Sequence, residues 1–241
     1  MSAFETIIYE KQDGIAYVTL NRPKQLNAYS VQMRDDLYEV LGAVIDDPDT
    51  GVVILKAAGE KAFCAGADLT EFLTAPPPVA ARRARFARDI WGRFINVPQP
   101  IIAAMHGYVL GSGIEMSLCC DIRLCTDDAR FGLPEPGLGI IPAAGGSQTL
   151  PRTIGQAAAL EFLLSGRWLD AAEAVKRKLV NRVVSREYLL PTAEAMARRI
   201  LSCPQDAVRA AKQAVRRGLD LTLAEGLELE ARLAESLRSA A

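Results

Sequence analysis

Residues 101–120 constrain the fold of this chain more than any other stretch, because they are predominantly apolar and match the roughly 20 residues that cross a bilayer. His106, Glu115 and three glycines within the stretch argue against a membrane span. An acid in hydrocarbon is costly, whereas a folded core can hold it at a polar site. We therefore expect residues 101–120 to be a buried segment of a soluble protein.

Charge and cysteine content exclude several classes of protein. The 28 Lys and Arg residues nearly balance the 29 Asp and Glu residues, so no overall field attracts nucleic acid or an anionic membrane. The five cysteines and the one histidine show no zinc or redox spacing, so we expect no metal site and mostly buried, reduced thiols. The first residues lack the features of a signal or transit peptide, which predicts a cytoplasmic protein.

Apolar periodicity predicts an α/β fold with a sheet-rich core and a helical tail. The predicted strands are short apolar runs at residues 7–9, 15–20, 52–56, 101–105, 122–125 and 181–184. Helices predominate from residue 156, and the last three are expected from residue 192 onward. The predicted interruptions between helices are Asp47-Pro48, a loop at residues 132–146, Pro204 and residues 218–220.

Two glycine-containing loops, at residues 62–69 and 110–115, each follow a strand and open a predicted helix. Unpaired N–H groups and the positive end of the dipole at a helix N-terminus favour a developing oxyanion. Two such donors on one oxygen form an oxyanion hole, in which the loss of one donor costs about 3 to 4 kcal/mol. Turn geometry alone also explains a glycine at either position, and spacing does not decide between the two explanations.

Two acids are candidates for proton transfer, and each has a structural explanation as well. Ser112 and Glu115 fit a capping box, in which the acid reaches back to the helix N-cap. Glu135 lies in a turn-rich loop, where an acid is usually solvated. If both meet in an apolar pocket, they can divide acid and base duties as a coupled pair. Nucleophilic schemes are weak, because Ser112 lacks the G-x-S-x-G elbow and His106 is the only histidine.

A proline run at residues 75–78 precedes a helix pattern around Trp91 and Phe94, which is interpreted as a lid or pocket wall. The pattern carries a run of basic residues: Arg82, Arg83, Arg85 and Arg88. They spread around the helix without interleaved aromatics, so a solvated face is favoured over RNA binding.

Motifs spread from Gly14 to about Ser185 resemble the crotonase (enoyl-CoA hydratase/isomerase) family. In order they are Asn21-Arg22-Pro23-Lys24 with Asn27-Ala28, residues 63–69, Gly107-Tyr108, residues 111–115, Cys120-Asp121-Ile122, Phe131-Gly132-x-Pro134-Glu135, residues 138–142, Gly145-Gly146, Gly166 and residues 179–184. The resemblance implies a crotonase-type spiral of ββα units with a helical C-terminal region. It implies a core at residues 1–190 with an acyl-CoA site, and an oligomerisation region at residues 191–241 that forms a homotrimer or a dimer of trimers.

The resemblance also assigns binding residues. The backbone N–H groups of Ala67 and Ser112 would form the oxyanion hole. Carbonyl groups near Ala65 and Ala67 would receive the adenine amino group, and Lys24 and Asp68 would complete the coenzyme A contacts. Coenzyme A is part of the substrate, and no cofactor is expected.

The retention of both family glutamates favours hydration of a 2-enoyl-CoA. Glu115 would assist the attack of water at C3, and Glu135 would deliver a proton to C2. An enoyl-CoA or dienoyl-CoA isomerase that uses Glu135 as a proton shuttle is the nearest alternative, and a noncatalytic oligomeric or RNA-associated protein is a third.

Three departures from the family pattern accompany the resemblance. Ser112 replaces a common glycine, and Thr70 stands where many relatives have a lysine. The C-terminal helical region is expected to be shortened. Acyl-chain length does not follow from these motifs.

Overall fold

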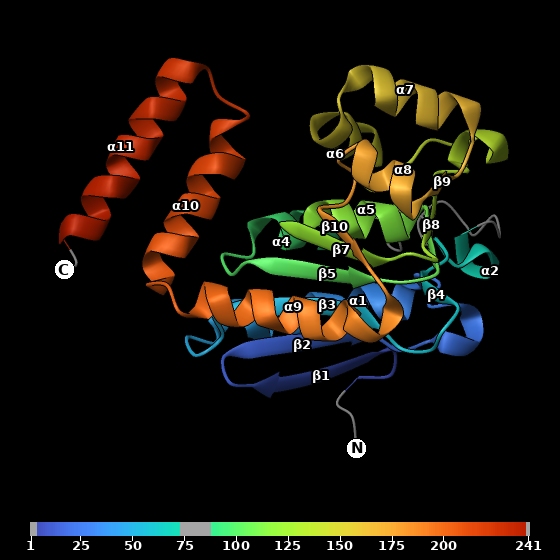
Figure 1. Cartoon of the computed structure of the whole chain (residues 1–241), viewed down its shortest axis with the longest axis horizontal. Coiled ribbons are helices and arrows are strands. Elements are labelled where there is room, and N and C mark those ends of the chain that lie inside the picture. The colour runs from blue at the N-terminus through green and yellow to red at the C-terminus, as the bar shows by residue number, and fades with distance from the viewer. Residues whose placement is uncertain (1–3, 73–87, 240–241) are drawn as a thin grey trace.

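The structure is a computed structural model that describes residues 4–72 and 88–239. Its helices and strands build a mixed α/β fold with two sheets (Figure 1), which confirms the predicted class. The proline run at residues 75–78, with Arg82, Arg83 and Arg85, lies outside the described residues. The predicted helix around Trp91 and Phe94 is confirmed as α4 (Ile90–Asn96), and its interpretation as a lid or pocket wall stays a prediction. Arg88 is described, and its guanidinium forms an ion pair of 2.8 Å with Glu39.

The larger sheet has six strands in the order β1-β2-β3-β5-β7-β10, and only β1 and β2 are antiparallel. The strands are β1 (Ile7–Gln12), β2 (Ile15–Leu20), β3 (Val52–Ala57), β5 (Ile101–Met105), β7 (Ile122–Thr126) and β10 (Arg182–Val184). Their register places Ile102 beside Ile54 on β3 and beside Ile122 on β7. Five of the six match predicted runs to within one residue at each end, and β1 extends three residues beyond its predicted end. Apolar runs are the primary strand signal.

A second sheet of four short strands follows the order β4-β6-β8-β9. They are β4 (Ala62–Cys64), β6 (Tyr108–Leu110), β8 (Arg130–Gly132) and β9 (Leu169–Asp170). The sequence did not predict this sheet, because strands of two or three residues carry no measurable period.

Ten helices are described, and those before the last two contact the sheets or one another. They are α1 (Val31–Asp46), α2 (Leu69–Phe72), α4 (Ile90–Asn96), α5 (Ser112–Cys119), α6 (Gly146–Ile154), α7 (Gln156–Ser165), α8 (Ala171–Lys176), α9 (Arg186–Leu201), α10 (Gln205–Gly218) and α11 (Leu223–Ser239). Short 3₁₀ turns occupy Pro23–Gln25 and Glu135–Leu138, the latter inside the predicted loop at residues 132–146. The first tail helix begins at Arg186 rather than at residue 192, so that predicted start was wrong.

Both faces of the larger sheet are buried at its central strands β3 and β5, which explains why these parallel strands are continuous apolar runs rather than alternating ones. On β3, Val53 and Leu55 face the cluster that holds α1, α4 and α5. Val52 and Ile54 face a second cluster, which is completed by α9 through Leu189, Ala193 and Ala197. Each fully buried Val, Leu or Ile contributes about 1.5 to 3 kcal/mol relative to exposure.

Residues 101–120 form β5, β6 and the buried helix α5, as expected for a core segment. Within the described ranges, no helix is long and apolar enough to span a membrane. Helix α9 continues across residue 190, so the proposed division between residues 1–190 and 191–241 coincides with no chain break and stays a prediction. Figure 1 shows α10 and α11 as a pair of helices apart from the group formed by α6, α7 and α8.

Candidate active site

The N-terminus of α5 provides the first of the two predicted amide donors. Gly111 is the N-cap residue and has φ +47° and ψ −118°, a conformation that only glycine adopts readily. Its N–H donates to the carbonyl of Gly132 at 2.9 Å, and the first intrahelical bond runs from Glu115 N to Gly111 O. The amide of Ser112 is therefore one of the helix's orphan donors, without an acceptor among the described residues.

The loop before α2 provides the second donor. Tyr29 N donates to Gly66 O and Asp68 N donates to Tyr29 O, both at 2.8 Å, in a parallel bridge opposite Ala67. In this pattern the residue between the two bonds turns its own N–H away from the neighbouring strand. The Ala67 amide therefore points away from Tyr29, and no described residue accepts from it.

The two loops touch through their glycines. A Cβ atom built on Gly111 would lie 3.4 Å from Gly66 Cα, so the backbones are in close contact there. Gly66 has φ +104°, which again favours glycine. Ala67 and Ser112 each follow one of these glycines directly, so the fold brings both predicted donor residues to one place.

Glu135 approaches the same point from the 3₁₀ turn. Its Oε1 lies 2.7 Å from the position that a Cβ on Gly111 would occupy. Its Oε2 is buried and has no hydrogen-bond partner among the described residues. Burial raises the pKa of the Glu135 carboxyl above its ordinary value, because the charged form loses hydration. A carboxyl with one unpartnered oxygen and a raised pKa is suited to giving and taking a proton.

Glu115 lies one turn into α5, about 6 Å along the axis from Gly111. The residue is only 3% exposed, and its Oε1 accepts the N–H groups of Ala144 at 2.9 Å and Gly146 at 3.0 Å. The capping-box explanation was wrong, because Gly111 takes the N-cap position and no side chain caps the helix. Glu115 therefore lies in the first turn of α5, and the carboxyl of Glu135 lies against the N-cap of the same helix.

The predicted coenzyme A residues lie on the neighbouring loops. Lys24 is exposed in the 3₁₀ turn Pro23–Gln25 and lines a cavity of about 360 Å³ with Lys61. Asp68 forms an ion pair of 2.9 Å with Arg22 and accepts a hydrogen bond from the Thr70 hydroxyl at 2.7 Å. These bonds, the one from Thr70 first, hold the pKa of the Asp68 carboxyl below its ordinary value.

Asn27 is a structural residue of the site whose role the sequence did not predict. Its side chain is buried, accepts the N–H of Arg22 and donates to the carbonyls of Ala58 and Ala62. Its backbone has φ +54°, which asparagine tolerates better than most residues. Asn27 therefore ties the loop of Lys24 to β4, and Ala65 N completes the link by donating to Leu26 O.

The single histidine and four of the five cysteines are buried in the core. His106 is buried, and burial lowers the pKa of its imidazole. Burial raises the pKa of the Cys64 thiol to about 11 and that of Cys119 to about 12. Cys203 is the exposed one of the five free cysteines. Among the residues that the structure describes, no group of His, Cys, Asp or Glu is placed to hold a metal ion.

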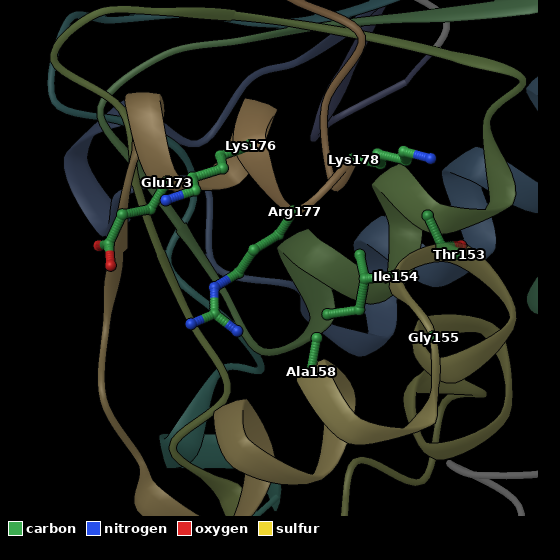
Figure 2. Close-up of a pocket in the computed structure, with 8 residues that line it drawn as sticks. All are labelled: Thr153, Ile154, Gly155, Ala158, Glu173, Lys176, Arg177 and Lys178. Atoms are coloured by element: carbon green, nitrogen blue, oxygen red, sulfur yellow. The ribbon is translucent and has the colours of Figure 1, made fainter.

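A separate cavity of about 620 Å³ lies between α6, α7 and α8 (Figure 2). Lys176 and Lys178 extend to opposite sides of it, and the Arg177 guanidinium is paired with Glu161 at 2.9 Å. Its lining includes one acid, Glu173, and none of the glycine-loop residues. This cavity therefore has fewer groups suited to catalysis than the first turn of α5 has.

Comparisons with known proteins agree with this fold and identify its family. A family model described as enoyl-CoA hydratase/isomerase matches residues 10–241. The chain is 42% identical to the "Probable enoyl-CoA hydratase echA8" of Mycobacterium bovis, covering 97% of this chain and 90% of the relative. It is 37% identical to the "Crotonyl-CoA hydratase" of Syntrophomonas wolfei, covering 95% and 88%.

A solved structure titled as an enoyl-CoA hydratase from Bacillus anthracis superposes with a TM-score of 0.92 at 39% identity, covering 96% of this chain and 90% of that one. The mixed α/β fold with its parallel sheets is thus the crotonase fold. The chain belongs to the enoyl-CoA hydratase/isomerase family.

Proposed function

We propose that this chain is an enoyl-CoA hydratase that reversibly adds water across the 2,3 double bond of a 2-enoyl-CoA thioester. The observation that carries the proposal is the pair of acids at the first turn of α5. Glu135, of raised pKa, lies against Gly111, and Glu115 is held by two backbone N–H groups. The names of the relatives support the same activity.

In the proposed mechanism, the amides of Ala67 and Ser112 donate to the thioester oxygen. They polarise the carbonyl and stabilise the enolate that forms when C3 is attacked, and each such donor contributes about 3 to 4 kcal/mol. Both donors are fixed by the backbone before substrate arrives, so they need no reorganisation during the reaction.

The two acids have separate roles in the addition of water. Glu115 assists the attack of the water oxygen at C3, with its orientation fixed by Ala144 and Gly146. Glu135 delivers a proton to C2, a role supported by the raised pKa that keeps more of its carboxyl protonated. The product carries a hydroxyl on C3 and a hydrogen on C2. The reaction adds only the elements of water, so the proposed mechanism requires no cofactor.

We further propose that Lys24, Ala65, Ala67 and Asp68 contact coenzyme A. Lys24 is exposed and free to meet a phosphate, whereas the ion pair of Asp68 with Arg22 favours a role in holding the loop shape. Balanced charge and unpaired cysteines support a cytoplasmic enzyme of acyl-CoA metabolism.

Assembly into a homotrimer or a dimer of trimers is part of the proposal, with residues 191–241 as the interface. Neither α10 nor α11 buries a residue within the chain, although they carry exposed Val215, Leu219, Leu223 and Leu227. A second copy that covers these side chains would remove the exposed apolar surface. Sedimentation should give a trimeric or hexameric mass, and Leu223→Glu should lower it; a wild-type monomer would contradict this part.

The test of the activity uses crotonyl-CoA and the purified chain. We expect loss of the ultraviolet absorbance of the enoyl thioester with formation of 3-hydroxybutyryl-CoA. Glu135→Gln should abolish turnover, whereas Glu10→Gln, an exposed acid on β1, should not change it. Turnover that depends on Glu135 would also exclude a noncatalytic role, and its absence on every enoyl-CoA would contradict the proposal.

An enoyl-CoA isomerase is a second candidate, favoured by one observation. Glu135 alone has a partnerless oxygen, and a single such acid suffices to move a proton between two carbons. Glu115→Gln separates the two functions, because hydration requires both acids. Migration of a 3-enoyl double bond without water uptake in the wild-type protein would favour the isomerase.

A further inference from the structure

Three basic side chains on one face of α10 reach the body of the protein. Arg209, Lys212 and Arg216 follow one another at i, i+3 and i+7, the spacing of one helix face. Arg209 donates to the Thr50 carbonyl at 3.3 Å, and Lys212 donates to the Gln99 carbonyl at 2.8 Å. Because α10 has no buried residue, these polar contacts are important in holding it to the body.

Asp121 is the centre of this attachment. Its Oδ2 accepts the N–H of Ile101 and the ammonium of Lys212, both at 2.7 Å, and its Oδ1 accepts Arg216 Nε at 2.8 Å. The side chain of Lys212 is 9% exposed and that of Asp121 is 18% exposed, so water screens this pair only weakly. Asp121 belongs to a motif noted in the sequence to which the proposed mechanism gives no role.

Arg216 extends the attachment to α5. Its second nitrogen donates to the Cys119 carbonyl at 2.6 Å, and Cys119 is the last residue of α5. Arg123 donates to the next carbonyl, that of Cys120, at 2.9 Å. Two guanidinium groups thus bind the C-terminal end of the helix, where carbonyls lack intrahelical partners and positive charge is favoured.

The helix so anchored is short and fully buried. Its eight residues span about 12 Å, and its other end carries the Ser112 amide and Glu115. A helix of two turns moves as a rigid unit, so a displacement at Cys119 is transmitted to Ser112 with little loss.

We propose that Arg216 is a positioning residue for the active site: through Asp121 and the Cys119 carbonyl, it makes α10 fix the helix that carries the Ser112 amide and Glu115. The expected effect on catalysis rests on the proposed function, whereas the anchoring of α5 does not. It gives the C-terminal hairpin of α10 and α11 a role within its own subunit in addition to the proposed interface.

The first test compares Arg216→Met with Arg217→Met. Methionine keeps an unbranched apolar stem but removes every donor. Arg217 is the exposed neighbour, and its side chain forms no hydrogen bond or ion pair with the described residues. With crotonyl-CoA as substrate, Arg216→Met should lower kcat by about tenfold to a hundredfold, and KM should change by less than about threefold. A fall in kcat of this size is expected when catalytic groups are misplaced by up to about 1 Å. Arg217→Met should match the wild type in both constants.

A second measurement does not depend on the reaction. Hydrogen–deuterium exchange of a peptide that covers residues 112–119 should become at least several-fold faster in Arg216→Met and stay unchanged in Arg217→Met. Sedimentation of both variants should give the wild-type mass, which separates positioning from assembly. Arg216→Lys keeps the charge opposite Asp121, so it should restore part of kcat and of the exchange protection.

The outcomes separate the two proposals. If the wild type hydrates no enoyl-CoA but Arg216→Met still speeds exchange in α5, the proposed function fails and the anchoring stands. If Arg216→Met keeps wild-type kcat, or if exchange rises in α10 alone, the inference is overturned. Loss of activity that accompanies only a fall in oligomeric mass also overturns it.

Discussion

Gly111→Ala is the substitution whose effect follows most directly from the geometry of the site. Gly111 has φ +47° and ψ −118°, and forcing an alanine into such a region costs about 1 to 3 kcal/mol. For a chain of this length each kcal/mol lowers Tm by about 2 to 4 °C, so we expect a loss of several degrees.

The larger effect of Gly111→Ala is on catalysis. The added methyl group would lie 2.7 Å from Glu135 Oε1, whereas ordinary contact begins at 3.4 Å, so the carboxyl must retreat by at least 0.7 Å. Misplacement on this scale lowers the rate by about a hundredfold. The affinity for substrate should change little, because coenzyme A would be bound by other loops.

The assay is the hydration of crotonyl-CoA, with Gly137→Ala as the control. Gly137 belongs to the same 3₁₀ turn as Glu135, and a Cβ there meets nothing within 4 Å. The control should keep its kcat and Tm. A Gly111→Ala enzyme that stays folded and retains the wild-type kcat would refute the placement of Glu135 over the N-cap of α5.

Three further predictions test other contacts of the site. Burial raises the pKa of the Glu135 carboxyl, so its ionised form destabilises the folded protein. This destabilisation is absent below the ordinary carboxyl pKa and develops as pH rises through the pKa of the folded protein. Glu135→Gln should therefore raise Tm near neutral pH but not at about pH 4. Asn27→Ala removes three hydrogen bonds, one buried and two partly buried, at about 1 kcal/mol each, so chemical denaturation should show a loss of about 3 kcal/mol. A methyl group on Gly146 would lie 2.9 Å from Glu115 Oε1, so Gly146→Ala should lower kcat by at least about tenfold, and an unchanged kcat would contradict the role of that carboxylate.

The larger sheet could be predicted from the sequence because its central strands are buried on both faces. The run at residues 101–105 is entirely apolar, and it forms β5 with those bounds. The second sheet could not be predicted, since β6 and β8 have three residues each and their pairing joins positions more than 20 residues apart. Long-range pairing of short strands leaves no local signal.

The residues of the candidate site could be selected from the sequence, but the hydrogen bonds that hold them could not. The glycine loops and both acids were selected from motif order, whereas the partners of Glu115 lie about 30 residues away, on the loop before α6 and at its first residue. The capping box failed because the positive φ of Gly111 moved the N-cap one residue earlier. The anchoring face of α10 resembled ordinary solvated charge, because Asp121 and Cys119 approach it only in the folded chain.

The most direct test of the account is a structure of the protein with bound acetoacetyl-CoA, a thioester that has no 2,3 double bond to hydrate. We expect the thioester oxygen within about 3 Å of both the Ala67 and the Ser112 amide nitrogens. We also expect the carboxyl groups of Glu115 and Glu135 to face C2 and C3 of the acyl chain. A thioester oxygen that meets neither amide, or an acyl chain bound in the cavity beside α8, would contradict it.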